Sequence, residues 1–384
     1  MSGLQYWADL PNDLLHSIVS LLGTFPDLLA FAATCRSWCA AFSSHPSKSN
    51  FSILLPPLLL QPDVPVCSHR PRPFNNNIIP KRPCYVTDLA NQDTYMCCQI
   101  PLFACFGNIT APPSPLDSYD FWGASYGHLI LSNKKSCLVV DVFTGVSVST
   151  PQLPFDEHSR PYYTYAALTA PPASPNSHLL VTTGSQNFFW RVGSHAWLSC
   201  SVHIGILKQV VIFKGQVFGM DYDCRLFIIH LVPQIRIEKI AVDWEGSMTS
   251  KQHLSHPWLV ACGDMLLLVG WHRSLPSTGD NFEAFRLDLS RKPAKWLKVE
   301  KLENWAIFFS IDERSQPLCC KNPERWRGTS NCIYCYFHDS KNWITFELGK
   351  PLQGEASNPS VIIFISRDNV MQPMWVMPSM FCDG

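Results

Sequence analysis

The sequence is poor in charged residues. Asp, Glu, Lys and Arg together make up 16% of its 384 residues, where about a quarter is usual. Thirty basic residues balance 30 acidic ones. A general nucleic-acid binder carries a basic face or tail, so this balance argues against a nucleic-acid partner. With 12% aromatic residues and no net charge, the chain also lacks the composition of a disordered protein.

Long hydrophobic runs are missing as well. The apolar run 53–60 is too short for a membrane span and contains Pro56 and Pro57. Residues 1–22 lack the basic start of a secretory signal and carry acidic residues and a proline. We therefore expect a soluble protein of the cytoplasm or nucleus with no membrane partner. The 16 cysteines are then expected to be mostly reduced thiols packed in the core.

Catalytic motifs are scarce. There is no Walker loop, G-x-G-x-x-G or H-E-x-x-H sequence. Gly123–Gly127 matches G-x-S-x-G, which would make Ser125 the nucleophile of a serine hydrolase. That motif needs a helix directly after it, whereas residues 128–131 are typical of a strand. We expect no catalytic residue and no cofactor.

The best metal candidate is a group of cysteines with one histidine, namely Cys319, Cys320, Cys332, Cys335 and His338. Cys332 and Cys335 have the spacing of a zinc knuckle. The pattern over 332–337 predicts a strand, however, and a strand places these two side chains on opposite faces. We therefore expect buried thiols here and no metal site.

Helical periodicity is confined to residues 7–45. A first apolar stripe consists of Leu14, Leu15, Ile18, Leu21 and Leu22, and Gly23 ends it. Pro26 and Asp27 open a second helix, and a third pattern contains Cys35, Trp38, Cys39 and Phe42. Three helices this short cannot bury their apolar faces alone, so they need a partner or the rest of the chain.

The remainder of the chain is predicted to be β. Residues 46–83 hold nine prolines and no helical period, which indicates a semi-extended connector with room for the first strand. Short β runs with turn residues between them then recur to the end. Residues 258–300 hold four strands in the length of one propeller blade, and 210–242 repeat that rhythm. The strands are about twice the seven to nine of a sandwich, which favours an irregular β-propeller with tryptophans packed between blades.

The usual propeller signatures, Gly-Gly for kelch and Trp-Asp for WD40, do not occur. The charge cluster 321–327 is open to two interpretations, a solvated loop or a recognition patch around Trp326. We expect a mainly β fold: a small three-helix domain at 5–45, the connector at 46–83 and the propeller-like domain at 84–370.

The helical region resembles an F-box. The resemblance rests on 7–15 (Trp-Ala-Asp-Leu-Pro-Asn-Asp-Leu-Leu), on spaced apolar residues including Leu29, and on Cys35-Arg36-Ser37-Trp38. It implies binding to a Skp1-type adaptor. The residues that would form or support this contact are Leu10, Pro11, Leu14, Leu15, Ile18, Leu21, Leu28 and Trp38.

The rest of the chain resembles plant F-box proteins that carry a KIB-type β-propeller. The carrying segments are 123–129, 141–145, 153–154, 213–218, 322–326 and 330–334. The resemblance implies a non-catalytic substrate-recognition subunit of a Skp1–cullin–F-box E3 ubiquitin ligase, whose propeller recruits a protein target of unknown identity. The alternative is a propeller interaction scaffold that acts without a ligase, with residues 7–45 serving as a cap. The proline-rich connector favours a separable F-box.

Overall fold

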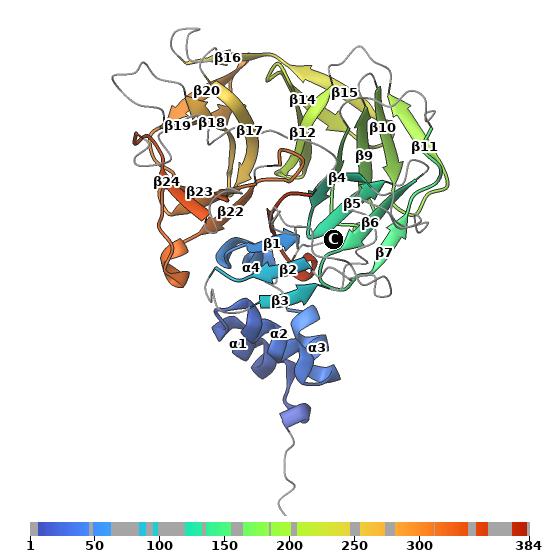
Figure 1. The fold of residues 1–384 in the computed structure, drawn as a ribbon, viewed down its shortest axis with the longest axis vertical. Helices are drawn as coiled ribbons and strands as arrows, with labels where there is room; N and C mark the ends of the chain where they lie inside the picture. Colours follow the sequence, from blue (N-terminus) through green and yellow to red (C-terminus); the bar gives the residue numbers. More distant parts are fainter. Residues whose placement is uncertain are drawn as a thin grey trace, which may run out of the picture.

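The structure is a computed structural model in which a small helical unit is followed by a ring of β-sheets (Figure 1). It describes residues 7–45, 49–62, 84–89, 95–98, 120–132, 136–154, 164–183, 186–200, 206–245, 254–272, 281–310, 312–336, 343–351 and 371–381.

The helical unit contains the helices that the periodicity predicts. The 3-10 helix η1 (Trp7–Asp9) leads into α1 (Asn12–Leu21), α2 (Phe25–Thr34) and α3 (Arg36–Ser43). A further helix, α4 (Ser49–Leu54), lies where we expected an extended connector. That expectation is wrong for these six residues, because a helix this short shows less than two turns of periodicity and is followed at once by prolines.

The strands form six sheets, which are the blades of a propeller (Figure 1). Blade 1 is β25 (Met374–Val376), β1 (Leu58–Pro62), β2 (Cys84–Thr87) and β3 (Tyr95–Cys98). Blade 2 is β4 (Asp120–Ser125), β5 (His128–Ser132), β6 (Cys137–Asp141) and β7 (Ser147–Ser149). Blade 3 is β8 (Tyr165–Leu168), β9 (His178–Thr183), β10 (Gln186–Arg191) and β11 (Trp197–Cys200).

The second half of the ring is less regular. Blade 4 is β12 (Leu207–Phe213), β13 (Gln216–Asp221), β14 (Leu226–His230) and β15 (Arg236–Ile240). Blade 5 has the order β16 (Val242–Trp244), β20 (Ala294–Val299), β19 (Asn281–Asp288), β18 (Met265–His272) and β17 (Leu254–Cys262). Blade 6 has the order β22 (Leu318–Lys321), β21 (Trp305–Phe309), β23 (Cys332–Tyr336) and β24 (Trp343–Glu347), with β21 parallel to β23.

Packing between blades buries some strands on both faces. All six residues of β9 and all five of β21 are buried. Trp258 of β17 stacks on Phe309 of β21 with ring centroids 4.4 Å apart, which joins blade 5 to blade 6. Large aromatic rings that fill the space between sheets contribute more than their buried area alone. The prediction that tryptophans pack between blades is confirmed at this contact.

The ring is closed by a strand from each end of the chain. β25 pairs antiparallel with β1, and Leu59 lies opposite Trp375. Trp375 also donates from Nε1 to the carbonyl of Phe309 (3.0 Å), and its ring packs edge-on against Phe308 at 5.2 Å. Blade 1 therefore draws on chain from inside the range 46–83 and from beyond residue 370.

A segment inside the ring holds three alternate blades together. Arg314 donates from Nη1 to the carbonyl of Phe121 in β4 (2.6 Å) and pairs with Asp312 at 2.7 Å, where both side chains are buried. Gln316 donates from Nε2 to the carbonyl of Val210 in β12 (3.0 Å). Because these acceptors belong to blades 2 and 4, the segment between β21 and β22 joins three blades at the centre.

The expected architecture, mainly β with a three-helix unit and an irregular propeller, is confirmed. The four strands predicted over 258–300 are β17 to β20, in one blade. The strands β2, β3, β4, β8, β16, β22 and β25 were not expected. The run 361–366, whose sequence also predicts a strand, lies outside the described residues. Among the helices that are described, none is long and apolar enough to cross a membrane.

Candidate functional site: the apolar face of the helical unit

The first two α-helices begin in different ways. Pro11 precedes α1 and accepts at its carbonyl from the backbone N–H groups of Leu14 and Leu15 (3.1 Å each). At α2, the Thr24 hydroxyl accepts from the Asp27 backbone N–H (3.2 Å) and donates to the Asp27 carboxylate (2.6 Å). Such side-chain caps satisfy the free N–H groups of a helix start, so the sequence itself fixes where α2 begins.

One side of α1 faces inward. Leu15 and Val19 are fully buried and lie one turn apart. They belong to a core that also contains Leu28 and Phe31 of α2 and Ala41 of α3. Burial of this kind stabilises the fold by about 1.5–3 kcal/mol for each large apolar side chain. These residues support the surface but do not form it.

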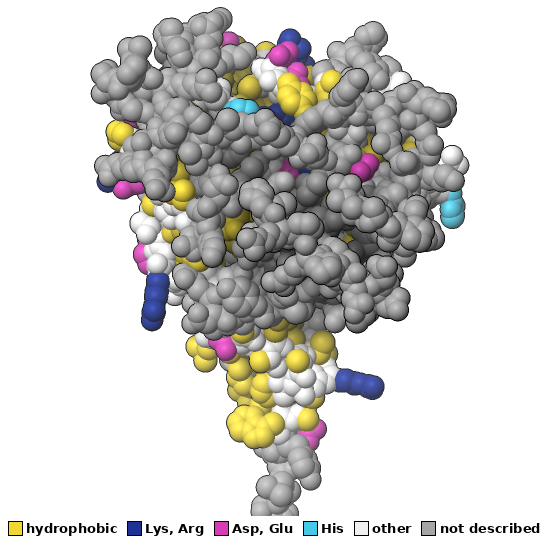
Figure 2. Space-filling view, viewed as in Figure 1, with side chains coloured by type: hydrophobic (Ala, Val, Ile, Leu, Met, Phe, Trp, Pro, Cys, Tyr) yellow, Lys and Arg dark blue, Asp and Glu magenta, His cyan; other side chains and the backbone are white. Residues whose placement is uncertain are grey.

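The other side of α1 faces solvent with apolar groups. Leu14 and Leu21 are 50% and 85% exposed, and Trp7 at the start of η1 is 74% exposed. Leu14 and Leu21 are seven residues apart, so they share a helix face with Pro11, which is also exposed. We call Trp7, Pro11, Leu14 and Leu21 the apolar face. Figure 2 shows apolar side chains gathered on the helical unit below the propeller.

Trp38 holds one end of this face in place. Its indole Nε1 donates to the carbonyl of Trp7 (2.9 Å), and its ring packs on Phe31 with centroids 4.6 Å apart. The neighbouring Ser37 hydroxyl donates to the carbonyl of Ala8 (2.7 Å). These hydrogen bonds tie η1 to the start of α3, and the one from Trp38 fixes the backbone position of Trp7.

The eight residues that the sequence predicted divide by exposure. Pro11, Leu14 and Leu21 are exposed, whereas Leu15 and Leu28 are fully buried and have no surface for a partner. Leu10, Ile18 and Trp38 are partly buried and pack against the core. Trp7 is not among the eight residues predicted for the adaptor contact, although its side chain is exposed. A tryptophan just before a helix start, outside the apolar stripe, was the signal that could have found it.

The helical unit has little charge with which to attract a partner. Residues 7–45 carry Asp9, Asp13, Asp27 and Arg36. A hydrogen bond with the Ser37 side chain lowers the pKa of the partly exposed Cys35 thiol. Burial, and then the nearby His16, lower the pKa of His45. With the His16 and His45 rings 5.3 Å apart, this histidine pair lies between α1 and the end of α3. Binding at the apolar face would therefore rest mainly on buried area.

The helical unit is docked onto the propeller by a cluster of phenylalanines. Phe381, at the end of the last described segment, packs against Phe25, Phe42 and Phe51 with ring centroids 5.8, 6.1 and 5.8 Å apart. Phe25 also meets Phe143 of the β6–β7 turn at 5.7 Å. The helices and blades 1 and 2 thus share one hydrophobic core. The connector's composition favours a separable module, whereas in the structure α4 and the late chain segment pack between the two parts.

The hydrolase-like motif has a structural role. Ser125 ends β4, and a two-residue turn leads directly into β5, where the motif would need a helix. The strand predicted after the motif is therefore confirmed. The buried Ser125 hydroxyl accepts from the Leu168 backbone N–H (3.2 Å), which joins blades 2 and 3.

The cysteines of the predicted zinc-like spacing point to opposite faces of β23, as expected. Cys332 packs with Phe308 and Tyr334, whereas Cys335 packs with Ile333 in a different core. Burial raises the pKa of Cys332 to about 11. His338 lies outside the described residues. Within the part of the chain that is described, no group of three or more His, Cys, Asp and Glu residues could hold a metal ion.

The charge cluster at 321–327 has two kinds of residue. Trp326 packs on Tyr334 at 5.7 Å and donates from Nε1 to the Cys320 sulfur (3.3 Å). Glu324, Arg325 and Arg327 are exposed. The tryptophan thus belongs to blade 6, and only the charged ends of the cluster are open to a partner.

Comparison with known proteins gives two family matches. The KIB1-4 beta-propeller model matches residues 99–357, and the F-box-like model matches residues 7–47. No curated protein gives a significant match. Among solved structures, the N-terminal domain of Nup159 is 6% identical, with 56% of both chains covered and a TM-score of 0.30. The WD40 domain of SCAP from fission yeast is 10% identical, with 60% of this chain and 51% of that chain covered and a TM-score of 0.31.

The chain spans little more than half the length of these solved chains, and likeness this low adds nothing to the assignment. The family matches coincide with the two parts of the fold: α1 to α3 lie within the first, and blades 2 to 6 within the second. An F-box before a propeller is the architecture of F-box substrate receptors, which are protein-interaction proteins whose F-box in general binds a Skp1-type adaptor. The propeller match covers the larger part of the sequence, and the chain belongs to the KIB1-4 β-propeller family, with an F-box-like domain in front of the propeller.

Proposed function

We propose that this protein is the substrate-recognition subunit of a Skp1–cullin–F-box E3 ubiquitin ligase in the cytoplasm or the nucleus. The apolar face binds the Skp1-type adaptor, which links the chain to a cullin. The propeller binds a protein target through its loops. The chain itself catalyses nothing and supplies proximity between the target and the recruited enzymes.

The observation that carries this proposal is the apolar face. Large apolar side chains that are exposed together on a surface mark an interaction site. Trp7, Leu14 and Leu21 stand within fifteen residues of one another in the sequence, on helices whose inner faces are already filled. Aromatic and aliphatic anchors of this kind provide most of the energy of a helical interface.

The docking of the F-box adds a second support. The contacts of Phe381 with Phe25, Phe42 and Phe51 hold the helices against blades 1 and 2. A ligase receptor gains from such a fixed arrangement, because a target on the propeller then has a defined position relative to the adaptor.

The alternative function is a propeller scaffold that acts without a ligase. The shared core favours it to some degree, since the helices also cover apolar parts of blades 1 and 2. A role as a cap, however, does not explain why Leu14 and Leu21 are exposed on the side of α1 that points away from the core. Deleting residues 1–45 cannot distinguish the two functions, because the deletion would also expose the shared core.

The test is a calorimetric titration of the full chain with a purified Skp1-type adaptor. We expect saturable one-to-one binding that the double substitution Leu14→Ala/Leu21→Ala weakens at least about tenfold, since interface anchors cost more than about 1 kcal/mol when truncated. Both side chains are exposed, so the melting temperature should stay within about 2 °C of the wild type.

The matched control is Val232→Ala/Leu289→Ala, which removes two exposed apolar side chains from propeller turns. This variant should bind the adaptor as the wild type does. Absence of binding by the wild type, or equal affinity in both double variants, would exclude the proposed adaptor contact.

A further inference from the structure

A small cavity next to the docking site of the F-box has a polar end. Its volume is about 270 Å³, which is below the usual range for a drug-sized ligand and suits a single side chain or a small molecule. It lies between blade 2, the β8–β9 loop of blade 3 and the C-terminal 3-10 helix η5 (Ser379–Phe381). The described apolar residues that line it are Val139, Val146, Val148, Pro172, Ala173 and Met380.

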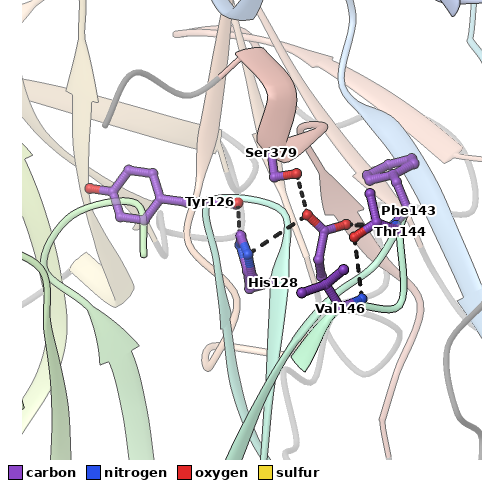
Figure 3. Close-up of polar contacts among 7 residues, drawn as sticks. Tyr126, His128, Phe143, Thr144, Val146 and Ser379 are labelled. Atoms are coloured by element: carbon purple, nitrogen blue, oxygen red, sulfur yellow. Dashed lines mark hydrogen bonds and ion pairs between the residues drawn. The ribbon is translucent and has the colours of Figure 1, made fainter. Parts of the chain in front are cut away.

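The polar end consists of His128, Asp141 and Ser379. The Ser379 hydroxyl donates to Oδ2 of Asp141, and His128 Nε2 lies 3.7 Å from the same oxygen. Figure 3 shows Ser379 and His128 directed at this one carboxylate from different elements. Oδ1 of Asp141 accepts from the backbone N–H groups of Phe143 and Thr144 (2.8 Å each), which fixes the orientation of the carboxylate.

The tautomer of His128 follows from the hydrogen-bond partner of its Nδ1 atom. Nδ1 lies 2.8 Å from the carbonyl oxygen of Tyr126. A carbonyl only accepts, so Nδ1 carries the proton, and Nε2 of the neutral ring has a lone pair. Burial lowers the pKa of His128, while the Tyr126 carbonyl and Asp141 oppose that effect. At neutral pH, Nε2 and Oδ2 are then two acceptors that face one another with no proton between them.

A cationic donor satisfies this arrangement best. Two acceptors 3.7 Å apart can both bind one ammonium group, which has three N–H donors. The His128 and Asp141 side chains are only 13% and 10% exposed, so a charge-assisted hydrogen bond here is stronger than in water. The apolar walls match an alkyl chain attached to such a group. An anion would meet the carboxylate, and a neutral apolar molecule would give the Nε2 lone pair of His128 no donor.

We propose that this cavity binds a primary alkylammonium group, with His128 Nε2 and Asp141 Oδ2 as its acceptors and the valine-lined wall around its alkyl chain. The group can belong to a free amine or to a lysine side chain. The site is independent of the apolar face and of the adaptor.

The experiment is a calorimetric titration of the full chain at pH 7.5 with three probes: butylammonium chloride, butanol and N-acetyl-lysine methylamide. We expect butylammonium to bind at least tenfold more tightly than butanol. If the lysine derivative matches butylammonium, the natural group is a lysine side chain, and if it binds tenfold more weakly, a free amine is the better fit. Both outcomes keep the ammonium site.

Two variants test the site itself. Asp141→Asn keeps the acceptor for the turn at Oδ1 and should weaken butylammonium binding at least tenfold. Val148→Trp, at a half-exposed position on the edge strand β7, should fill the cavity and abolish binding while the fold persists. The control His230→Gln removes another histidine that lies 3.6 Å from a carboxylate, on blade 4, and should change nothing.

The pH dependence separates this proposal from simple charge attraction. His128 must be neutral to accept, and Asp141 is the charged group that acts on it among the described residues. Butylammonium affinity should therefore fall as the pH is lowered below about 6.5, the ordinary pKa of histidine. Equal binding of butanol, unchanged affinity in Asp141→Asn and Val148→Trp, or affinity that does not depend on pH would overturn the proposal.

Discussion

At the scale of single residues, neighbouring leucines have opposite roles. Leu14 is half exposed and Leu15 is fully buried, although they are adjacent in α1. The sequence predicts both as members of one stripe, since i and i+1 positions are only 100° apart on a helix. Which edge of the stripe faces the core depends on where α2 and α3 pack. The residue types of the site could thus be predicted, but their division into contact and support could not.

Substitution of Trp38 can measure how much a supporting residue contributes to adaptor binding. Trp38→Phe removes the hydrogen bond to the Trp7 carbonyl and keeps an aromatic ring against Phe31. We expect a loss of about 1 kcal/mol in the free energy of unfolding, measured by urea denaturation, and weaker adaptor binding because η1 is released. Phe31→Leu, which leaves the hydrogen bond intact, is the control for the packing. Adaptor affinity unchanged in Trp38→Phe would show that adaptor binding does not depend on the hydrogen bond between Trp38 and Trp7.

At the scale of elements, the strands in regular hairpins could be predicted, and those that depend on distant partners could not. β5, β18 and β23 are apolar runs bounded by turn residues, and the sequence locates them within a residue or two. β25 has three residues and exists because β1 pairs with it across more than 300 positions. β22 is likewise short and follows the central segment instead of a turn. Local patterning carries no signal for pairings of this kind.

Two matched turns test how the late chain segment packs on blade 2. Gly127 and Gly215 each follow a residue of positive φ in a two-residue hairpin, and both have φ +74°. A Cβ at Gly127 would lie 2.5 Å from the carbonyl oxygen of Met377, whereas a Cβ at Gly215 would meet nothing within 4 Å. Gly215→Ala should cost about 1–2 kcal/mol of backbone strain. Gly127→Ala should cost several kcal/mol more, because backbone must move.

The measurement is urea denaturation of both variants, with tryptophan fluorescence as the signal. Equal destabilisation would mean that the segment 377–379 does not pack on the β4–β5 turn.

At the scale of the whole molecule, the F-box and the propeller share one hydrophobic core. The Phe381 cluster joins residues that are more than 300 positions apart, and the ring itself is closed by β1 and β25. The sequence predicts two domains with a connector, because composition changes sharply at residue 46. It cannot predict docking, since the docking residues are ordinary phenylalanines whose partners are set by the closed ring.

The free energy of unfolding of the protein should fall in mild acid. Burial is the main cause that lowers the pKa values of His45, His128 and His178 in the folded protein. Between these lowered values and about 6.5, the unfolded chain binds more protons than the folded one, so stability rises with pH through this window and levels off above it. The check is the free energy of urea unfolding between pH 5.5 and 7.5. His178→Gln should give a shallower slope, and stability that rises on acidification would refute this linkage.

The central claim is that the apolar face is the adaptor contact, and hydrogen exchange tests it most directly. The full chain is compared with and without a saturating Skp1-type adaptor, and amide exchange is followed by mass spectrometry. The account expects slower exchange across 7–21 and no change in the propeller turns around 214–215 and 289–293. Protection confined to the propeller, or unchanged exchange across 7–21 in a chain that does bind the adaptor, would contradict it.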